Sequence, residues 1–305
     1  MGPVLAFPDV GRGLAVGSAV TVSAPAKVNL ALRVGRTRAD GYHDVSTVLL
    51  TVGLADTVTI APTAAGVSLV RDPDPGFPAD DDLAVRAVRA LAAATGREPA
   101  VAIGLEKRIP IAAGLGGGSA DCAAALVACC SLWCIDVADP VIAGVAASLG
   151  ADVPFMLHGG CALYAGRGDE RVAALETPLL DLVLVNTGVA VPTAEVYRVF
   201  DTQLSPGSAS VDAMVRALAS GDRRALATAL ANDLTDAAVA VAPAIADVVA
   251  FVRHQPGVLG GLLAGSGGTV FGITESATAA ESAASAASSR GWWAVATSSA
   301  AARSA

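Results

Sequence analysis

The segment that most constrains the fold is a run of glycines that leads directly into an alanine-rich stretch. Residues 107–134 read KRIPIAAGLGGGSADCAAALVACCSLWC. Consecutive glycines allow left-handed backbone conformations, so several N–H groups can point into one concavity. Because a helix follows at once, the concavity lies at a helix N-terminus, where the dipole favours anions. The loop GLGGGSAD (114–121) therefore predicts a phosphate site, with a tight packing turn as the alternative.

This loop does not match the familiar nucleotide-binding motifs. A Walker A loop needs a lysine after its last glycine, and none is present here. A dinucleotide fingerprint needs GxGxxG with an acidic residue about 20 positions on, and the loop lacks the third glycine. A second glycine-rich segment, AGSGGT (264–269), is imperfect for either motif. Ser119 in the first loop could contribute a hydroxyl to phosphate or to a bound Mg²⁺, although the metal ligands stay open.

Charged residues in apolar surroundings carry a second signal. The segment PAKVNL (25–30) places Lys27 and Asn29 on alternate positions of a strand, hence on one face. In GADVPFML (150–157), Asp152 lies close to a glycine and a proline, in a chain that is otherwise poor in charge. A buried charge is costly unless it is paired or used. These residues are therefore candidates for chemistry, with structural ion pairs as the alternative.

Composition excludes several classes of protein. The chain has 305 residues, 53% apolar and 16% charged, so it can bury a core and is not intrinsically disordered. Its length predicts one large or two ordinary domains. A net charge of −8, with two lysines and no basic run, argues against a nucleic-acid partner.

Membrane insertion and disulfide bonding are also disfavoured. The uncharged stretch 122–135 is shorter than the roughly 20 residues that cross a bilayer, and 255–274 is broken by glycines. No signal peptide is evident. The five cysteines lack CxxC spacing and are odd in number, which predicts small core residues in a reducing compartment. We expect a cytoplasmic protein without a membrane partner.

Hydrophobic patterning predicts an α+β protein in two halves, with a boundary near 160–180. Residues 1–19 read as a loose N-terminal extension. Predicted strands cover residues 20–34 (interrupted by Pro25), 45–52, 56–60, 101–105, 161–165, 182–186, 270–273 and 291–297. Predicted helices run from the Asp82 cap to Gly96, after the glycine loop, over 139–149, from Thr193, in several pieces between 210 and 254, and over 276–289. Residues 150–157 and 260–268 are predicted turns.

Three separated segments resemble the motifs of the GHMP kinases, which include galactokinase, homoserine kinase, mevalonate kinase and phosphomevalonate kinase. These are PAKVNLAL from Pro25, PIAAGLGGGSADCAAAL from Pro110 and LLAGSGGTVFGI from Leu262. The resemblance implies a two-domain fold. Residues 20–165 would form a β-rich α/β domain with a left-handed βαβ-type phosphate loop, and residues 166–305 a ferredoxin-like α+β domain with the third motif.

Further segments are similar to one subgroup, the 4-diphosphocytidyl-2-C-methyl-D-erythritol kinases of the non-mevalonate isoprenoid pathway. They are RADGYHDV (38–45), GLGGGSAD (114–121), LGADVPF (149–155), VPTAEVY (191–197) and NDL (232–234), with RADGYH the most discriminating. The resemblance implies ATP-dependent phosphorylation of the substrate's 2-hydroxyl, giving the 2-phosphate and ADP, with ATP and Mg²⁺ as cofactors. The implied partner is this small molecule.

The resemblance also implies roles for individual residues. Asp152 would accept the hydroxyl proton, and Lys27 would orient it and offset charge on the transferred phosphoryl group, with Asn29 beside them. The ATP site would comprise Lys107, Pro110, Gly114, Leu115, Gly116, Gly117, Gly118 and Ser119, with Asp82 and Leu83 near the adenine. Gly265 and Ser266 would lie near the substrate's phosphates.

Aromatic residues would hold the cytosine. By the resemblance, Tyr42 stacks on the base, His43 bonds its edge, and Tyr197 closes a sandwich. One departure concerns the adenine: the family usually has Asn-Leu where this chain has Asp82-Leu83. Aspartate can still cap the helix, but it lacks the amide donor.

Two other interpretations remain open. One is another small-molecule kinase of the superfamily, of the mevalonate or homoserine type, against which RADGYH argues. The other is a non-catalytic sensor on the same fold, against which the retention of Lys27 and Asp152 argues. The oligomeric state is left open by the sequence.

Overall fold

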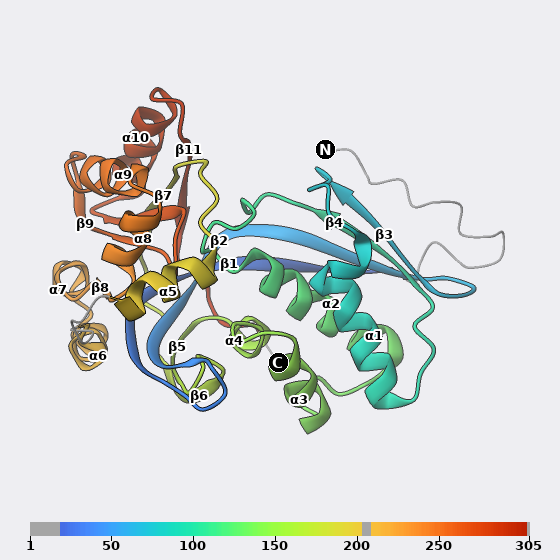
Figure 1. Cartoon of the computed structure of the whole chain (residues 1–305). Helices are drawn as coiled ribbons and strands as arrows, with labels where there is room; N and C mark the ends of the chain where they lie inside the picture. Colours follow the sequence, from blue (N-terminus) through green and yellow to red (C-terminus); the bar gives the residue numbers. More distant parts are fainter. Residues whose placement is uncertain (1–18, 203–208, 304–305) are drawn as a thin grey trace. The chain divides into compact units, whose positions relative to one another are not determined.

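The computed structural model describes residues 19–202 and 209–303, so most of the predicted N-terminal extension lies outside the described residues. Two compact units interleave along the chain (Figure 1). Unit 1 contains the described residues up to Pro25, together with Ala55–Ile111 and Gly117–Leu157. Unit 2 contains Ala26–Leu54, Ala112–Gly116 and the described residues from His158 onward. The predicted division into domains of residues 20–165 and 166–305 stays a prediction.

The interleaving follows from two long strands, β1 (Val20–Thr37) and β2 (His43–Pro62), which contribute residues to both units. The predicted interruption of the first strand at Pro25 is wrong, because the fixed φ of proline is compatible with extended backbone. The predicted strands 45–52 and 56–60 are one continuous strand. Gly53, which lies between them, is not among the glycines with positive φ, so it makes no turn.

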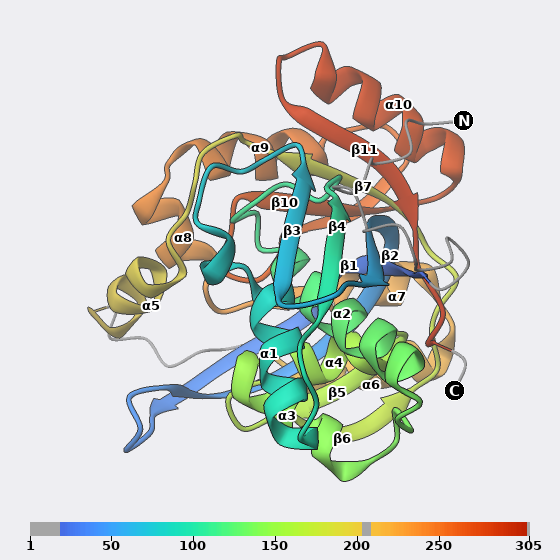
Figure 2. The ribbon, with the colours of Figure 1, turned by 90° about the vertical axis from the view of Figure 1, so that its right-hand side faces the viewer.

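Unit 1 combines a small sheet with helices. The end of β2 pairs antiparallel with β4 (Val101–Glu106), which pairs parallel with β3 (Val67–Asp72), a strand that the sequence analysis missed. Its helical elements are η1 (Ala79–Asp81), α1 (Leu83–Thr95), α2 (Gly117–Trp133), α3 (Pro140–Leu149) and α4 (Val153–His158). Helices α1, α2 and α3 pack against one another (Figure 2). The predicted caps are confirmed: Asp82 accepts from the N–H of Ala84, and Gly96 is left-handed.

Most of the apolar stretch 122–135 lies in helix α2, which is buried in the core. Ten of its residues are buried, on all sides of the helix. Cys122, Cys129 and Cys130 are among them, so they are core residues, whereas Cys134 beyond the helix end is exposed. Within the described ranges, every helix is too short or too polar to cross a membrane. The cytoplasmic location stays a prediction.

Unit 2 contains the remaining pairings of the long strands. Within it, β2 pairs antiparallel with β5 (Cys161–Ala165), which pairs with β6 (Glu170–Leu175). Strand β1 pairs parallel with the two-residue β8 (Ala231–Asn232). Short helices accompany them: α5 (Thr193–Thr202), α6 (Val211–Ser220), α7 (Arg223–Thr228) and α8 (Thr235–Val241).

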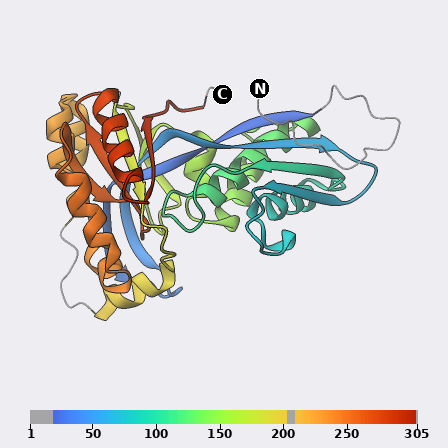
Figure 3. The same ribbon diagram turned by 90° about the horizontal axis from the view of Figure 1, so that it is seen from above.

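A four-stranded antiparallel sheet completes unit 2. Its strands β7 (Asp181–Asn186), β9 (Val258–Leu263), β10 (Thr269–Thr274) and β11 (Trp293–Ser298) lie in the order β11-β7-β10-β9. Helix α9 (Ala244–Arg253) directly precedes β9, at the end of the long connection from β7, and α10 (Ala277–Ser288) connects β10 to β11; both helices pack on the sheet (Figure 3). This split βαβ arrangement is ferredoxin-like, as predicted.

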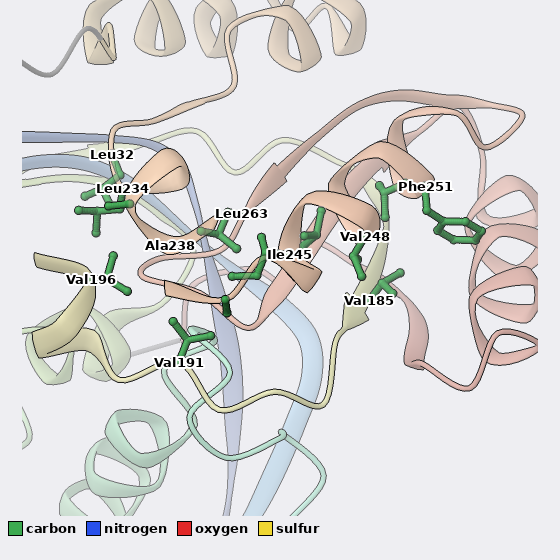
Figure 4. Close-up of a cluster of buried hydrophobic side chains, with 14 of the residues drawn as sticks. Leu32, Val185, Val191, Val196, Leu234, Ala238, Ile245, Val248, Phe251 and Leu263 are labelled. Atoms are coloured by element: carbon green, nitrogen blue, oxygen red, sulfur yellow. The ribbon is translucent and has the colours of Figure 1, made fainter. Parts of the chain in front are cut away.

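The predicted turn at 260–268 is too long, because Gly260 and Gly261 belong to strand β9. A Cβ on Gly261 would lie 2.9 Å from Val252 Cγ1, and one on Gly260 would lie 2.7 Å from the carbonyl oxygen of Ala227. Glycine is needed at these positions because helices approach the strand closely. The cluster of buried side chains between sheet and helices includes Val185, Leu263 and Ile245 (Figure 4).

Candidate functional site

The first glycine loop (residues 112–116) has the predicted left-handed backbone. Gly114 and Gly116 have φ of 77° and 70°, and Ala112 has φ of 52°. Helix α2 begins immediately afterwards, so Gly117, Gly118 and Ser119 form its first helical turn rather than a loop. N–H groups of a first turn have no acceptor within the helix. This turn therefore offers backbone donors to an anion, with the positive end of the helix dipole behind them.

The two glycine-rich segments interlock within unit 2. A Cβ on Gly114 would lie 2.2 Å from the carbonyl oxygen of Ala264 and 2.8 Å from that of Gly267. The N–H of Thr269 donates to the carbonyl oxygen of Ala113 at 3.1 Å. The second glycine loop (residues 264–268) thus lies directly against the first, and any side chain at position 114 would separate them.

Lys27 and Asn29 lie beside both glycine loops. The backbone N–H of Lys27 donates to the carbonyl oxygen of Leu115 at 2.9 Å, and its Nζ donates to Asn29 Oδ1 at 2.9 Å. Asn29 Nδ2 in turn donates to Thr47 Oγ1 at 2.9 Å. A Cβ on Gly265 would lie 3.4 Å from Lys27 Nζ. The structure thus brings together the predicted residues Lys27, Asn29, Leu115 and Gly265.

Residues of the NDL segment hold the second glycine loop from its other side. Asn232 Nδ2 donates to the carbonyl oxygens of Leu263 (3.0 Å) and Gly265 (2.8 Å). Ser266 shares a 2.8 Å hydrogen bond with Thr193, which begins α5. Sequence reasoning quoted both segments without giving Asn232 or Thr193 a role. Two amide-to-carbonyl bonds from one side chain fix the loop backbone at the position of Gly265.

In unit 1, the turn that carries Asp152 passes beside the start of α2. A Cβ on Gly150 would lie 3.9 Å from Ser119 Oγ. Asp152 immediately precedes α4, a helix where a turn was predicted; Pro154 falls in its first turn, where proline is tolerated. Leu83 lies against the same region, because a Cβ on Gly118 would be 3.4 Å from Leu83 Cδ1. Ser119, Gly118, Leu83 and the Asp152 turn are therefore neighbours.

Lys107 is held in a buried ion cluster. Its Nζ donates to Asp56 Oδ2 at 2.5 Å and to Asp121 Oδ2. Asp56 Oδ1 also accepts the backbone N–H groups of Arg108 (2.5 Å) and Ile109 (2.8 Å). Sequence reasoning missed Asp56, although an acid inside an apolar strand segment is the signal that called attention to Lys27 and Asp152.

The carboxyl groups around Lys107 are not equivalent. Asp121 is 3% exposed, and its Oδ1 has no hydrogen-bond partner among the residues described. Burial raises the pKa of Asp121 to about 7, with Lys107 opposing the shift and Asp56 adding to it. Burial lowers the pKa of Lys107, but the two carboxylates outweigh it and leave that pKa above its ordinary value. Two acids thus share one ammonium.

Asp82 performs the capping role expected of it. Its Oδ1 accepts from the N–H of Ala84 at 2.9 Å, and its Oδ2 lies 3.4 Å from Arg71 Nη1. Both carboxylate oxygens therefore have partners within unit 1. Its predicted place near the adenine, like that of Leu83, stays a prediction, as does the place of Pro110 in the ATP site.

The predicted base-binding residues lie together in unit 2, in an arrangement that differs from a simple sandwich. Tyr197 packs on His43, with ring centroids 5.0 Å apart. His43 Nε2 lies 2.7 Å from Asp201 Oδ1. Tyr42 is 57% exposed, and the Arg167 guanidinium lies 5.3 Å from its ring centroid. Sequence reasoning missed Arg167 and Asp201.

The turn that presents Tyr42 is fixed by local bonds. Gly41 has φ of 84°, which favours glycine, and the N–H of Arg38 donates to the carbonyl oxygen of Tyr42 at 2.6 Å. The N–H of Tyr42 donates to Asp40, and this bond is the main cause of a pKa of Asp40 below its ordinary value. Arg38 also pairs with Asp44 at 2.8 Å. The RADGYH motif is thus a self-bonded turn that displays an exposed aromatic ring.

Comparisons with known proteins bear on these motifs. The model of the GHMP kinase N-terminal domain matches residues 82–160, and that of the C-terminal domain matches residues 214–291. The 4-diphosphocytidyl-2-C-methyl-D-erythritol kinase of Pelotomaculum thermopropionicum is 44% identical over 256 residues, covering 84% of this chain and 89% of that protein. The chain belongs to the GHMP kinase family.

Other matches are similar. The enzyme of the same name from Mycolicibacterium gilvum is 43% identical over 271 residues, covering 86% of this GHMP kinase and 84% of that protein. A crystal structure of 4-(cytidine 5'-diphospho)-2C-methyl-D-erythritol kinase superposes with a TM-score of 0.78 at 36% identity, covering 92% of this chain and 99% of that one. A homoserine kinase from Cytophaga hutchinsonii, with a TM-score of 0.71 at 19% identity and coverage of 95% and 97%, shares the fold.

Proposed function

We propose that this GHMP kinase transfers the γ-phosphoryl group of ATP to the 2-hydroxyl of 4-diphosphocytidyl-2-C-methyl-D-erythritol, in the non-mevalonate isoprenoid pathway. The observation that carries the proposal is the 44% identity to a kinase of that name over most of both chains. The RADGYH turn, which displays Tyr42 and His43, supports the cytidyl substrate over mevalonate or homoserine.

The chemistry requires positioning and charge neutralisation more than covalent participation by the protein. The 2-hydroxyl oxygen forms a bond to the γ-phosphorus while the bond to the oxygen of departing ADP breaks. The hydroxyl proton must leave, and Asp152 accepts it in this proposal. The nearness of its turn to the first turn of α2, at Ser119, supports that role. A positioned general base contributes about 10²–10⁴ to the rate.

Phosphate binding falls to backbone donors and one lysine. The first turn of α2 presents Gly117, Gly118 and Ser119 to the ATP phosphates, as expected of a helix N-terminus. The Lys27 ammonium offsets the negative charge on the transferred group. It donates to the Asn29 amide beside Gly265, next to the loop proposed to bind the substrate's phosphates. Gly265 and Ser266 serve the substrate's phosphates.

The aromatic residues recognise the cytosine. Nε2 of His43 faces Asp201 Oδ1, so the tautomer with its proton on Nε2 would bond that carboxylate and leave Nδ1 as an acceptor. Cytosine offers a 4-amino donor to such an acceptor, whereas uracil offers a carbonyl. Tyr42, exposed at the turn, stacks on the base. Tyr197 packs on His43 and holds its ring in place.

The cofactors are ATP and Mg²⁺. The described ranges contain no group of three or more His, Cys, Asp or Glu residues that could hold a metal by themselves. Such a site is not required, because Mg²⁺ usually binds through substrate phosphates with few protein ligands. The Ser119 hydroxyl, in the first turn of α2, fits as one of them. When bound, the ion neutralises charge on the phosphates.

A coupled ADP-release assay with Mg·ATP tests the proposal. It compares 4-diphosphocytidyl-2-C-methyl-D-erythritol with mevalonate, homoserine and galactose. Turnover of the cytidyl substrate alone is the expected result. Turnover of another alcohol would keep the kinase and reject the base-binding residues. Binding of ATP without turnover of any alcohol would favour a sensor.

A further inference from the structure

Lys107 matches a residue of the family's ATP-phosphate site, yet its ammonium group is occupied by the fold. Its Nζ lies between Oδ2 of Asp56 and Oδ2 of Asp121, and the side chain is 11% exposed. Both acids are buried, Asp56 at 1% and Asp121 at 3% exposure. Two carboxylates have more than enough negative charge to cancel one ammonium group. Lys107 therefore has little positive charge to offer a phosphate.

The same cluster fixes the short chain segment that packs against the start of α2. Asp56 Oδ1 accepts the N–H groups of Arg108 and Ile109, so it fixes the backbone at those two residues. Ile109 packs on the helix start, because a Cβ on Gly117 would lie 3.0 Å from Ile109 Cγ2. The same Cβ would lie 3.7 Å from Asp56 Oδ2. The cluster thus contacts the first turn of α2 at Gly117.

Asp121 attaches the cluster to the helix itself. It lies in the second turn of α2, and its bond to Lys107 connects that turn to the end of β4. Asp56 connects both to β2. Glycines at 117 and 118 give the first turn little stiffness of its own. External contacts must then hold its N–H groups in position.

We propose that Asp56, Lys107 and Asp121 form a positioning cluster that sets the first turn of α2 for phosphate binding, and that Lys107 acts through the two acids rather than by touching ATP. The inference deepens the proposed function by changing how its nucleotide site works. Without Lys107, two buried carboxylates would face each other close to the anion-binding turn. Their mutual repulsion would destabilise the fold, and their negative charge would repel phosphate.

The test is a charge-balancing rescue, read out by binding of a non-hydrolysable Mg·ATP analogue and by thermal unfolding. Lys107→Met should weaken analogue binding by about 10- to 10²-fold and lower the Tm by about 10 °C. Lys107→Met combined with Asp121→Asn leaves one carboxylate, still bonded to two backbone N–H groups. The double variant should recover most of both losses.

A direct phosphate contact predicts a different pattern. In that case the double variant would recover Tm but not analogue binding, because the missing ammonium group cannot be replaced by an amide at position 121. That result would overturn the proposal, as would a Lys107→Met protein with unchanged Tm and binding. Arg108→Met is the matched control: its side chain is exposed and its N–H, which bonds Asp56, is retained. It should change neither quantity.

A second variant covers the case in which Lys107→Met yields no folded protein. Asp56→Asn replaces an acceptor with an amide opposite Lys107 and should weaken analogue binding, with the KM for the cytidyl substrate unchanged. Unchanged analogue binding would refute the positioning role. Because analogue binding needs no phosphate acceptor, these results stand apart from the substrate assay: failure of that assay would remove the proposed function and leave this test intact.

Discussion

The two lysines of this chain have contrasting surroundings. Lys107 in unit 1 is enclosed by two carboxylates, and its pKa lies above the ordinary value. Lys27 in unit 2 donates to the amide of Asn29, next to the second glycine loop. Motif resemblance alone assigns both to the kinase reaction. Their positions separate them: Lys107 lies between two buried acids and is suited to hold a structure together, whereas Lys27 bonds the Asn29 amide next to the second glycine loop, which is proposed to bind the substrate's phosphates.

The largest effect should come from an acid outside the Lys107 cluster. Asp152→Asn should lower kcat by about 10²–10⁴, because an amide cannot accept the hydroxyl proton. ATP binding and Tm should stay close to those of the wild type, in contrast to Asp56→Asn. Steady-state kinetics with thermal melts measure both. An Asp152→Asn enzyme with normal kcat would remove Asp152 from the chemistry.

Lys27→Met should lower kcat by about 10²–10³, the loss expected when one donor to a charged transition state is removed. Its Tm should fall less than that of Lys107→Met, because Lys107→Met leaves two buried carboxylates, Asp56 and Asp121, facing each other. Comparing kcat and Tm of the two lysine variants tests the contrast directly. Equal changes in kcat and in Tm for the two variants would show that the two lysines have the same role.

Tyr42→Ala should act on the substrate alone. Loss of a stacked base costs about 1–3 kcal/mol, which corresponds to roughly a 5- to 150-fold rise in KM for the cytidyl substrate. Because the ring is exposed, Tm and the KM for ATP should hardly change. A parallel Phe substitution, which keeps the ring, should leave the KM near normal. Equal rises in both KM values after Tyr42→Ala would contradict a base-stacking role.

The last expected effect is a pH dependence of stability. The pKa of Asp121 is about 7 in the folded protein against an ordinary 3.8, so between these values the folded state binds more protons than the unfolded state. This carboxyl therefore makes stability fall as pH rises from about 4 to 7, and adds no slope above 7. Asp121→Asn removes the slope. The Tm difference, variant minus wild type, should rise across that window; a constant difference would refute the raised pKa.

The parts of the structure that were predictable carry local signals. Asp82 and Gly96 mark the ends of α1 by capping, and the glycines at 114 and 116 have the positive φ that their run suggests. Pro25 and Gly53 are misleading, because proline and glycine break a strand only where the backbone departs from extended geometry. The contact between Asp56 and Lys107 joins residues 51 positions apart, so no local sequence pattern predicts it.

The predictable part of the site is likewise the part carried by contiguous motifs. RADGYH, the glycine loops and the Lys27–Asn29 pair were found because each lies within a few residues. Partners supplied by distant segments were missed: Asp201 for His43, Arg167 for Tyr42 and Asn232 for the second glycine loop. Such contacts depend on how helices and strands pack in three dimensions, and this packing cannot be read from a single sequence.

The interleaving of the two units has a consequence for biosynthesis. All of unit 1 has been synthesised once Leu157 has been translated, while Ala26–Leu54 still lacks β5 and β8, the strands that pair with it. Those residues of β1 and β2 keep unpaired edges until β5 and β8 have been synthesised. Exposed strand edges invite wrong association. The nascent chain is thus most vulnerable midway through translation, and a fragment that ends near residue 157 would keep a permanently open edge.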